Sequence, residues 1–133
     1  MTVKRLSPDD PREWLSRAKS NLLRSQAQIE GVYLEDLCFD AQQAAEKALK
    51  SVLIYKKLRF PYVHDLGELL AMVKRSGEEV PDAVLQAARL TRYAVAMRYP
   101  GVVEPVTQAE YAEAVAIAGA VVEWADKVLK TGG

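Results

Sequence analysis

Apolar residues recur at the spacing of an α-helix in five segments of this 133-residue chain, and proline or glycine separates one segment from the next. The longest pattern lies in the second segment, between about 34 and 57. Its apolar residues recur at steps of three or four: Leu37, Ala41, Ala44, Ala48 and Val52. No run of residues alternates as a strand would, and the sequence therefore predicts an all-α fold.

The other four helices are predicted, in chain order, over about 11–30, 64–75, 81–97 and 107–130. Asp10 is a good N-cap for the first of them, and Gly31 ends its pattern. Thr107 and Glu110 stand three residues apart, which is the form of a capping box at the start of the last helix. These signals make the helix starts better defined than the helix ends.

The apolar residues of these four segments also predict which side chains face the core. In chain order they are Leu15, Ala18, Leu22, Ile29, Leu66, Leu69, Leu70, Val73, Ala83, Leu85, Ala88, Leu90, Val95, Val115, Gly119, Val122 and Leu129. Short connections between consecutive helices favour antiparallel packing. We therefore expect an antiparallel up-and-down bundle of four to five helices, in a single domain over residues 1–133 with its core between about 12 and 130.

The composition argues against several classes of protein. Lys and Arg total 18 and so do Asp and Glu, whereas a non-specific nucleic-acid binder usually needs a basic surplus. No apolar stretch approaches the roughly 20 residues of a membrane span or has the form of a signal peptide, which predicts a cytoplasmic protein without membrane contact. Cys38 and His64 are the only cysteine and histidine, and no glycine-rich phosphate loop is present, so we expect neither a metal nor a cofactor.

Three short stretches of the sequence resemble the HEPN family (higher eukaryotes and prokaryotes nucleotide-binding domain). They are CFDAQQAAEKALK at 38–50, His64-Asp65-Leu66 followed by Leu69-Leu70, and Tyr93 followed by Arg98-Tyr99-Pro100. The resemblance covers roughly residues 12 to 130. It implies a helical bundle, frequent dimerisation and an association with nucleotides or RNA. It also implies a possible partner, because many members are encoded beside small nucleotidyltransferases and act in two-component, toxin–antitoxin-like systems.

Other members of this family are metal-independent ribonucleases, in which an arginine is followed four to six residues later by a histidine. His64 has Arg59 five residues before it, but this pair flanks Pro61, whereas the family's motif belongs to a later helix. No histidine follows the later arginines, Arg89, Arg92 and Arg98. Gly101 also stands where many relatives have an aspartate after Arg-Tyr-Pro. We therefore expect no catalytic centre, with His64 as the only weak candidate.

A polar stripe runs beside the alanine face of the second segment, at steps of three and four: Asp36, Asp40, Gln43, Lys47 and Lys50. One interpretation is a solvated face with Asp-to-Lys pairs that stabilise the helix by a few tenths of a kcal/mol each. The other is a groove wall that meets a nucleotide or a partner. The resemblance favours Asp40, Gln43 and Lys47 as ligand-binding residues.

A second group of candidate ligand-binding residues lies near the end of the fourth segment: Arg92, Tyr93, Arg98 and Tyr99. Arginine offers a bidentate fork to phosphate, and a tyrosine ring offers a surface on which a base can stack. Arg89 and Arg92 share a helix face and can form a local basic patch with Arg98. The alternative is a structural role, because cations are favourable near a helix C-terminus.

Three hypotheses of function follow. The first is a non-catalytic module that forms a homodimer, or a complex with a nucleotidyltransferase, and binds a nucleotide or RNA phosphate. The second is a ribonuclease that uses an arginine and His64 in acid–base chemistry on the RNA 2′-hydroxyl. The third is a structural partner subunit without any ligand.

Overall fold

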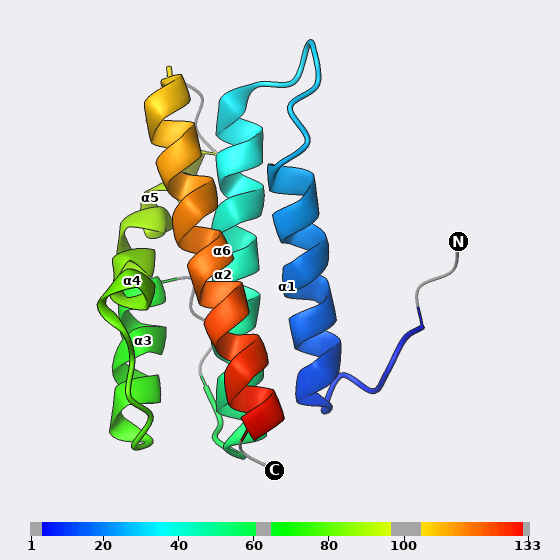
Figure 1. The fold of residues 1–133 in the computed structure, drawn as a ribbon, viewed down its shortest axis with the longest axis vertical. Coiled ribbons are helices and arrows are strands. Elements are labelled where there is room, and N and C mark those ends of the chain that lie inside the picture. The colour runs from blue at the N-terminus through cyan, green and yellow to red at the C-terminus, as the bar shows by residue number, and fades with distance from the viewer. Residues whose placement is uncertain (1–3, 61–64, 97–104, 132–133) are drawn as a thin grey trace.

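The computed structural model describes residues 4–60, 65–96 and 105–131, and every regular element in these ranges is helical (Figure 1). In chain order the elements are α1 (Pro11–Ser25), α2 (Leu34–Tyr55), α3 (Leu66–Arg75), α4 (Asp82–Leu85), the 3₁₀ helix η1 (Gln86–Thr91), α5 (Arg92–Ala96) and α6 (Gln108–Thr131). The predicted all-α bundle is confirmed. Figure 1 also shows the chain directions: α1 runs opposite to α2, and α6 runs in the same direction as α2.

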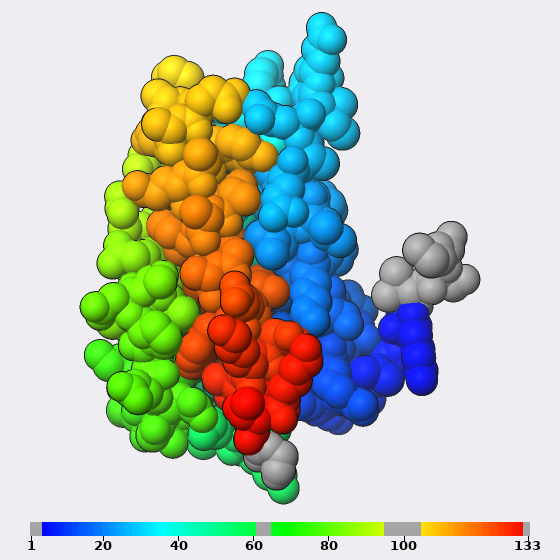
Figure 2. Space-filling model, in the orientation of Figure 1, coloured from blue at the N-terminus to red at the C-terminus, as the bar shows by residue number. Residues whose placement is uncertain are grey.

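The central element is α2, which contacts α1, α3, η1, α5 and α6. Its predicted apolar face is confirmed, since Leu37, Ala41, Ala44, Ala48 and Val52 are all buried. Figure 2 shows α6, in orange and red, between α1 on one side and the shorter helices on the other. None of the helices in the described ranges is both long enough and apolar enough to cross a membrane.

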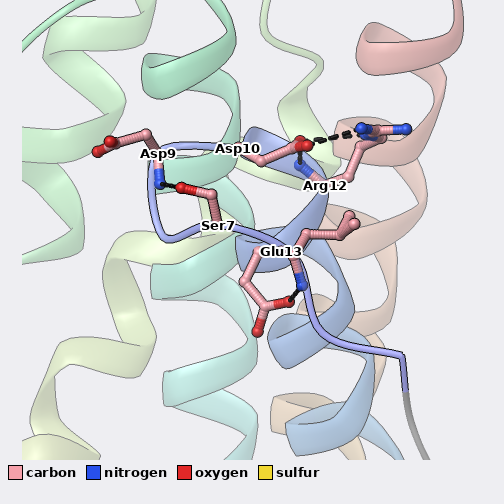
Figure 3. A network of polar contacts seen from close by, with 6 residues as sticks. Ser7, Asp9, Asp10, Arg12 and Glu13 are labelled. Atoms are coloured by element: carbon pink, nitrogen blue, oxygen red, sulfur yellow. Dashed lines mark hydrogen bonds and ion pairs between the residues drawn. The ribbon is translucent and has the colours of Figure 1, made fainter.

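The predicted helix starts are confirmed by side-chain caps. The Asp10 carboxylate accepts a hydrogen bond from the backbone N–H of Arg12 (2.9 Å) at the start of α1, as Figure 3 shows. Before α6, the backbone N–H of Thr107 donates to Glu110 Oε1 (3.0 Å), and that of Glu110 donates to Thr107 Oγ1 (3.1 Å). This is the predicted capping box, and it pairs two backbone donors that the helix itself leaves open.

The first helix ends earlier than predicted, at Ser25 and not near Glu30. The Ser25 carbonyl oxygen accepts a hydrogen bond from the Tyr111 hydroxyl of α6 (2.6 Å). It is therefore already paired at the point where the helix stops. The residues after Ser25 form a connection in which Ile29 is 63% exposed, so the prediction that Ile29 faces the core is wrong.

The fourth predicted helix is divided by the 3₁₀ helix η1. Its buried residues are Val84, Ala87, Leu90 and Tyr93, at a constant step of three. A 3₁₀ helix has three residues per turn, so residues three apart lie on one face. The apolar residues that marked this segment in the sequence do not follow that step: Leu90 is buried and Leu85 is partly buried, whereas Ala83 and Ala88 are exposed.

The buried stripe of α6 is also displaced from its predicted position. Its buried residues are Tyr111, Ala114, Ile117, Ala118, Val121, Val122, Ala125 and Val128. Val122 was predicted, whereas Val115, Gly119 and Leu129 are only partly buried. The buried stripe includes three alanines, and α6 contacts the alanine-rich helix α2. Most of the predicted positions stand one residue after a buried one, which is a rotation of about 100° around the helix.

Candidate functional site

Polar side chains of α1 and α2 meet along one line between the two helices. This polar seam consists of Arg17, Asn21 and Arg24 from α1 and Asp40, Gln43 and Lys47 from α2. Asn21 joins the two helices: its Nδ2 donates to Asp40 Oδ1 (3.2 Å), and its Oδ1 accepts from Lys47 Nζ (2.8 Å). Arg24 lies 3.5 Å from the same Asp40 oxygen. Asp40 is only 6% exposed, so this part of the predicted stripe faces α1 and not solvent.

Lys47 is the least neutralised cation of the polar seam. The hydrogen bond given above joins its ammonium to a neutral amide. Burial lowers the pKa of Lys47, and the positive charge of Arg17 lowers it further. Glu46 and Asp40 act in the opposite direction, and Arg24 again lowers the pKa. The ammonium is therefore half-buried and subject to the positive charge of two guanidinium groups, and another negative charge beside it would be favourable.

A second polar cluster on α2 is buried under aromatic rings. We call it the capped pair; it consists of Glu46 and Lys50 with Trp14 and Phe60. Lys50 Nζ donates to Glu46 Oε2 (2.9 Å) and lies 5.9 Å and 5.3 Å from the centres of the Trp14 and Phe60 rings. The two rings meet edge to face, with their centres 6.0 Å apart. Lys50 belongs to the predicted stripe, but its ammonium is enclosed and serves packing.

An amide relay connects the capped pair to the polar seam. Gln42 Nε2 donates to Glu46 Oε1 (2.9 Å), and Gln43 Nε2 donates to Gln42 Oε1 (2.7 Å). Gln42 is fully buried, whereas Gln43 is half-buried. Of the predicted ligand-binding residues of α2, Asp40 and Lys47 therefore meet through Asn21, while Gln43 is tied to the adjacent cluster.

The other predicted group is only partly within the described residues. Arg92 is exposed and lies 3.8 Å from Glu110 and 5.4 Å from the Tyr93 ring centre. Tyr93 is buried, and burial raises its pKa. Arg89 pairs with Glu113 at 2.7 Å, so glutamates of α6 balance both arginines. The remaining candidates, His64, Arg98 and Tyr99, lie outside the residues that the structure describes.

Cys38 lies inside the core and not in a reactive site. It is fully buried, and burial raises the pKa of its thiol from 9.0 to about 11, against a hydrogen bond with Tyr93 that acts in the opposite direction. A thiolate is the nucleophilic form of cysteine, and its formation is opposed here. We therefore assign Cys38 a packing role.

The raised pKa of Cys38 predicts a loss of stability at alkaline pH. Between pH 9 and 11 the unfolded chain releases the thiol proton while the folded protein retains it, so the free energy of unfolding falls as pH rises. The contribution is on the order of 2 kcal/mol by pH 11. Urea unfolding of wild type and Cys38→Ala at pH 8 and 10.5 measures it, and the wild type should lose more stability. Equal losses would contradict the assignment.

A surface hollow of about 450 Å³ adjoins the polar seam, beneath the connection between α1 and α2. Its lining residues are Arg24, Ala27, Ile29, Val32, Asp36, Leu37, Phe39 and Asp40. Arg24 and Asp40 belong to both the hollow and the polar seam, so the two features are continuous. Most of the lining residues are apolar, and the charged ones are Arg24, Asp36 and Asp40.

The α1 side of the polar seam was missed in the sequence. Arg17, Asn21 and Arg24 follow one another at steps of four and three, which is the same spacing that reveals the stripe of α2. That signal was available, but it does not tell which other helix the residues face. Within 4–60, 65–96 and 105–131, no three His, Cys, Asp or Glu side chains are grouped as metal ligands would be.

Comparisons with known proteins give one consistent family. The model of the HEPN domain matches residues 11–128. The solved structure of ST0689, an archaeal HEPN homologue, is 25% identical with a TM-score of 0.73, over 96% of this chain and 99% of that one. The structure of TT1696 from Thermus thermophilus is 29% identical with a TM-score of 0.74, over 88% of this chain and 96% of that one. No curated protein matches the chain.

Proposed function

Since this chain belongs to the HEPN domain family, we propose that it is a non-catalytic module that binds the phosphate of a nucleotide or RNA at the polar seam. The observation that carries this proposal is the position of Lys47. Its half-buried ammonium is subject to the positive charge of Arg17 and Arg24 and donates to a neutral amide. A phosphate would supply the missing negative charge and would raise the pKa of Lys47 back toward its ordinary value.

The two arginines of the seam are exposed enough to contact an anion on the solvent side of the seam. The side chains of Arg17 and Arg24 are 53% and 71% exposed, whereas their carboxylate partners, Glu13 and Asp40, are nearly buried. Each guanidinium group therefore contacts a nearly buried carboxylate on one side, and its remaining N–H donors face solvent. Such donors form charge-assisted, often bidentate hydrogen bonds with phosphate.

We also propose that the module pairs with a second copy of itself or with a nucleotidyltransferase. Leu23 and Tyr33 support this proposal, because they are 69% and 72% exposed at the same end of the molecule. Large apolar and aromatic side chains of this kind are enriched in protein interfaces. The proposal places the chain in the cytoplasm, where nucleotides, RNA and such partners are available.

The first test is a thermal-unfolding screen of the purified chain with inorganic phosphate, ATP and a short single-stranded RNA, with light scattering on the same samples. We expect a dimer whose melting temperature rises with a phosphate-bearing ligand, because a ligand that prefers the folded state stabilises it by mass action. The RNA should remain intact after prolonged incubation.

Two outcomes would overturn this proposal. A melting temperature that no ligand changes would favour a structural partner subunit. RNA cleavage that is lost in His64→Ala would favour a ribonuclease, because a histidine near its usual pKa can serve as acid or base. Cleavage that persists in His64→Ala would remove His64 from consideration as the catalytic residue.

A further inference from the structure

We propose that the hollow beside the polar seam is a base subsite, and that the nucleotide it selects carries guanine. This inference rests on the proposed function, because it requires the phosphate at Arg17, Arg24 and Lys47. It adds a second, separate part of the ligand and a specificity that the seam alone does not supply.

The order of side chains along α1 and α2 matches the order of groups in a nucleotide. The apolar hollow lies at the start of α2, the carboxamides of Asn21 and Gln43 follow, and Lys47 comes last. Asp36 in the hollow and Lys47 are eleven residues apart, which is about 16 Å along the helix axis. The long side chains of Lys47 and Arg24 shorten this span. A base in the hollow can therefore extend its ribose over the carboxamides and its phosphate to the cations.

The hollow has the size and the lining of a small-molecule site. Its volume of about 450 Å³ falls within the usual range of such pockets, which are mostly apolar with a few polar groups that fix orientation. Ile29 and Val32 are exposed and Phe39 is half-buried in the free protein. A planar base would cover these side chains, and the removal of apolar surface from water is favourable.

Asp36 gives the hollow its selectivity. It is half-buried in the lining, and its carboxylate has no hydrogen bond or ion pair with any residue in the described ranges. Asp40, in contrast, is already bound to Asn21 and Arg24. An ionised carboxylate only accepts hydrogen bonds. Guanine presents two adjacent donors, its ring N1–H and its 2-amino group, whereas adenine presents an amino group beside an acceptor nitrogen.

Calorimetric titrations with GMP, AMP and inorganic phosphate test this assignment on the full chain. We expect GMP to bind about 5- to 100-fold more tightly than AMP, because a good bidentate pair discriminates between bases by about 1–3 kcal/mol. Asp36→Asn should abolish this preference and leave phosphate binding unchanged. Asp9→Asn is the matched control: its carboxylate is exposed and points away from Asp10 and Arg12 in Figure 3, and it should keep the preference.

A second variant tests the hollow itself. Val32 is exposed, so Val32→Trp should fold normally and fill the hollow; it should weaken GMP binding about 10-fold and leave phosphate binding unaffected. Equal binding of GMP and AMP to wild type, with no effect of Asp36→Asn, would overturn the base subsite while phosphate binding at the seam stands. Failure of phosphate and both nucleotides to bind would overturn the proposed function, and the base subsite with it.

Discussion

Replacing Lys50 with alanine should lower the free energy of unfolding by about 3–5 kcal/mol. The substitution removes the ammonium that pairs with the Glu46 carboxylate, at a place where the two side chains are only 7% and 4% exposed. It also removes a cation that lies within 6 Å of the centres of both the Trp14 and the Phe60 ring. Equilibrium unfolding in urea, followed by circular dichroism, measures the change.

The helix α6 offers a matched control for this substitution. Lys127 and Glu123 form the same Glu-to-Lys pair four residues apart, but both side chains are 71% exposed. An exposed pair of this kind contributes less than about 1 kcal/mol, so Lys127→Ala should leave the unfolding midpoint almost unchanged. If both variants lost the same small amount, the capped pair would not be an important part of the core.

Replacing Lys47 with methionine should lower the affinity for inorganic phosphate about 10- to 100-fold. A hydrogen bond to a charged group is worth about 1.5–3 kcal/mol, which corresponds to that range. Methionine retains most of the stem but has neither the charge nor the N–H donors. Lys19→Met is the control, because Lys19 faces α6, where it pairs with Asp126. Calorimetric titration of both variants with phosphate gives the comparison, and equal affinities would remove Lys47 from the site.

The same Lys47 variant has a pH signature in the absence of ligand. Since the pKa of Lys47 is lowered in the folded protein, the unfolded chain binds more protons between that pKa and the ordinary value of 10.5. The stability of the wild type should therefore rise relative to that of Lys47→Met as the pH increases through this window. A constant difference between the two proteins would show that Lys47 is fully solvated.

The sequence was sufficient to predict the buried residues where a helix keeps 3.6 residues per turn and buries one apolar face. The positions predicted for α2 and α3 meet both conditions, and all of them are buried. It was insufficient where the period changes, because no local signal shows that η1 winds with three residues per turn. In α6 apolar residues lie on several faces of the helix, so the pattern alone did not identify which face is buried, and the predicted stripe lies about one residue away from the observed one.

The candidate site was predicted on one side only. Asp40 and Lys47 were identified from the stripe on α2, but their connection depends on Asn21, which lies 19 and 26 residues earlier. A single sequence contains the spacing of each stripe and no information about which stripes face each other. The hollow was not predicted at all, because it forms where α1 ends early and the chain crosses to α2.

The polar seam also determines the register of α1 against α2. The buried face of α2 is rich in alanine and therefore smooth, so α1 could slide along it by one turn, about 5.4 Å, with little change in apolar contact. Asn21 prevents this, because a slide would separate it from both Asp40 and Lys47 and leave a buried carboxylate and a half-buried ammonium unpaired. The residues that we assign to ligand binding therefore also select a single alignment of the helix pair, so substitutions in the seam should be judged by fold uniqueness as well as by affinity.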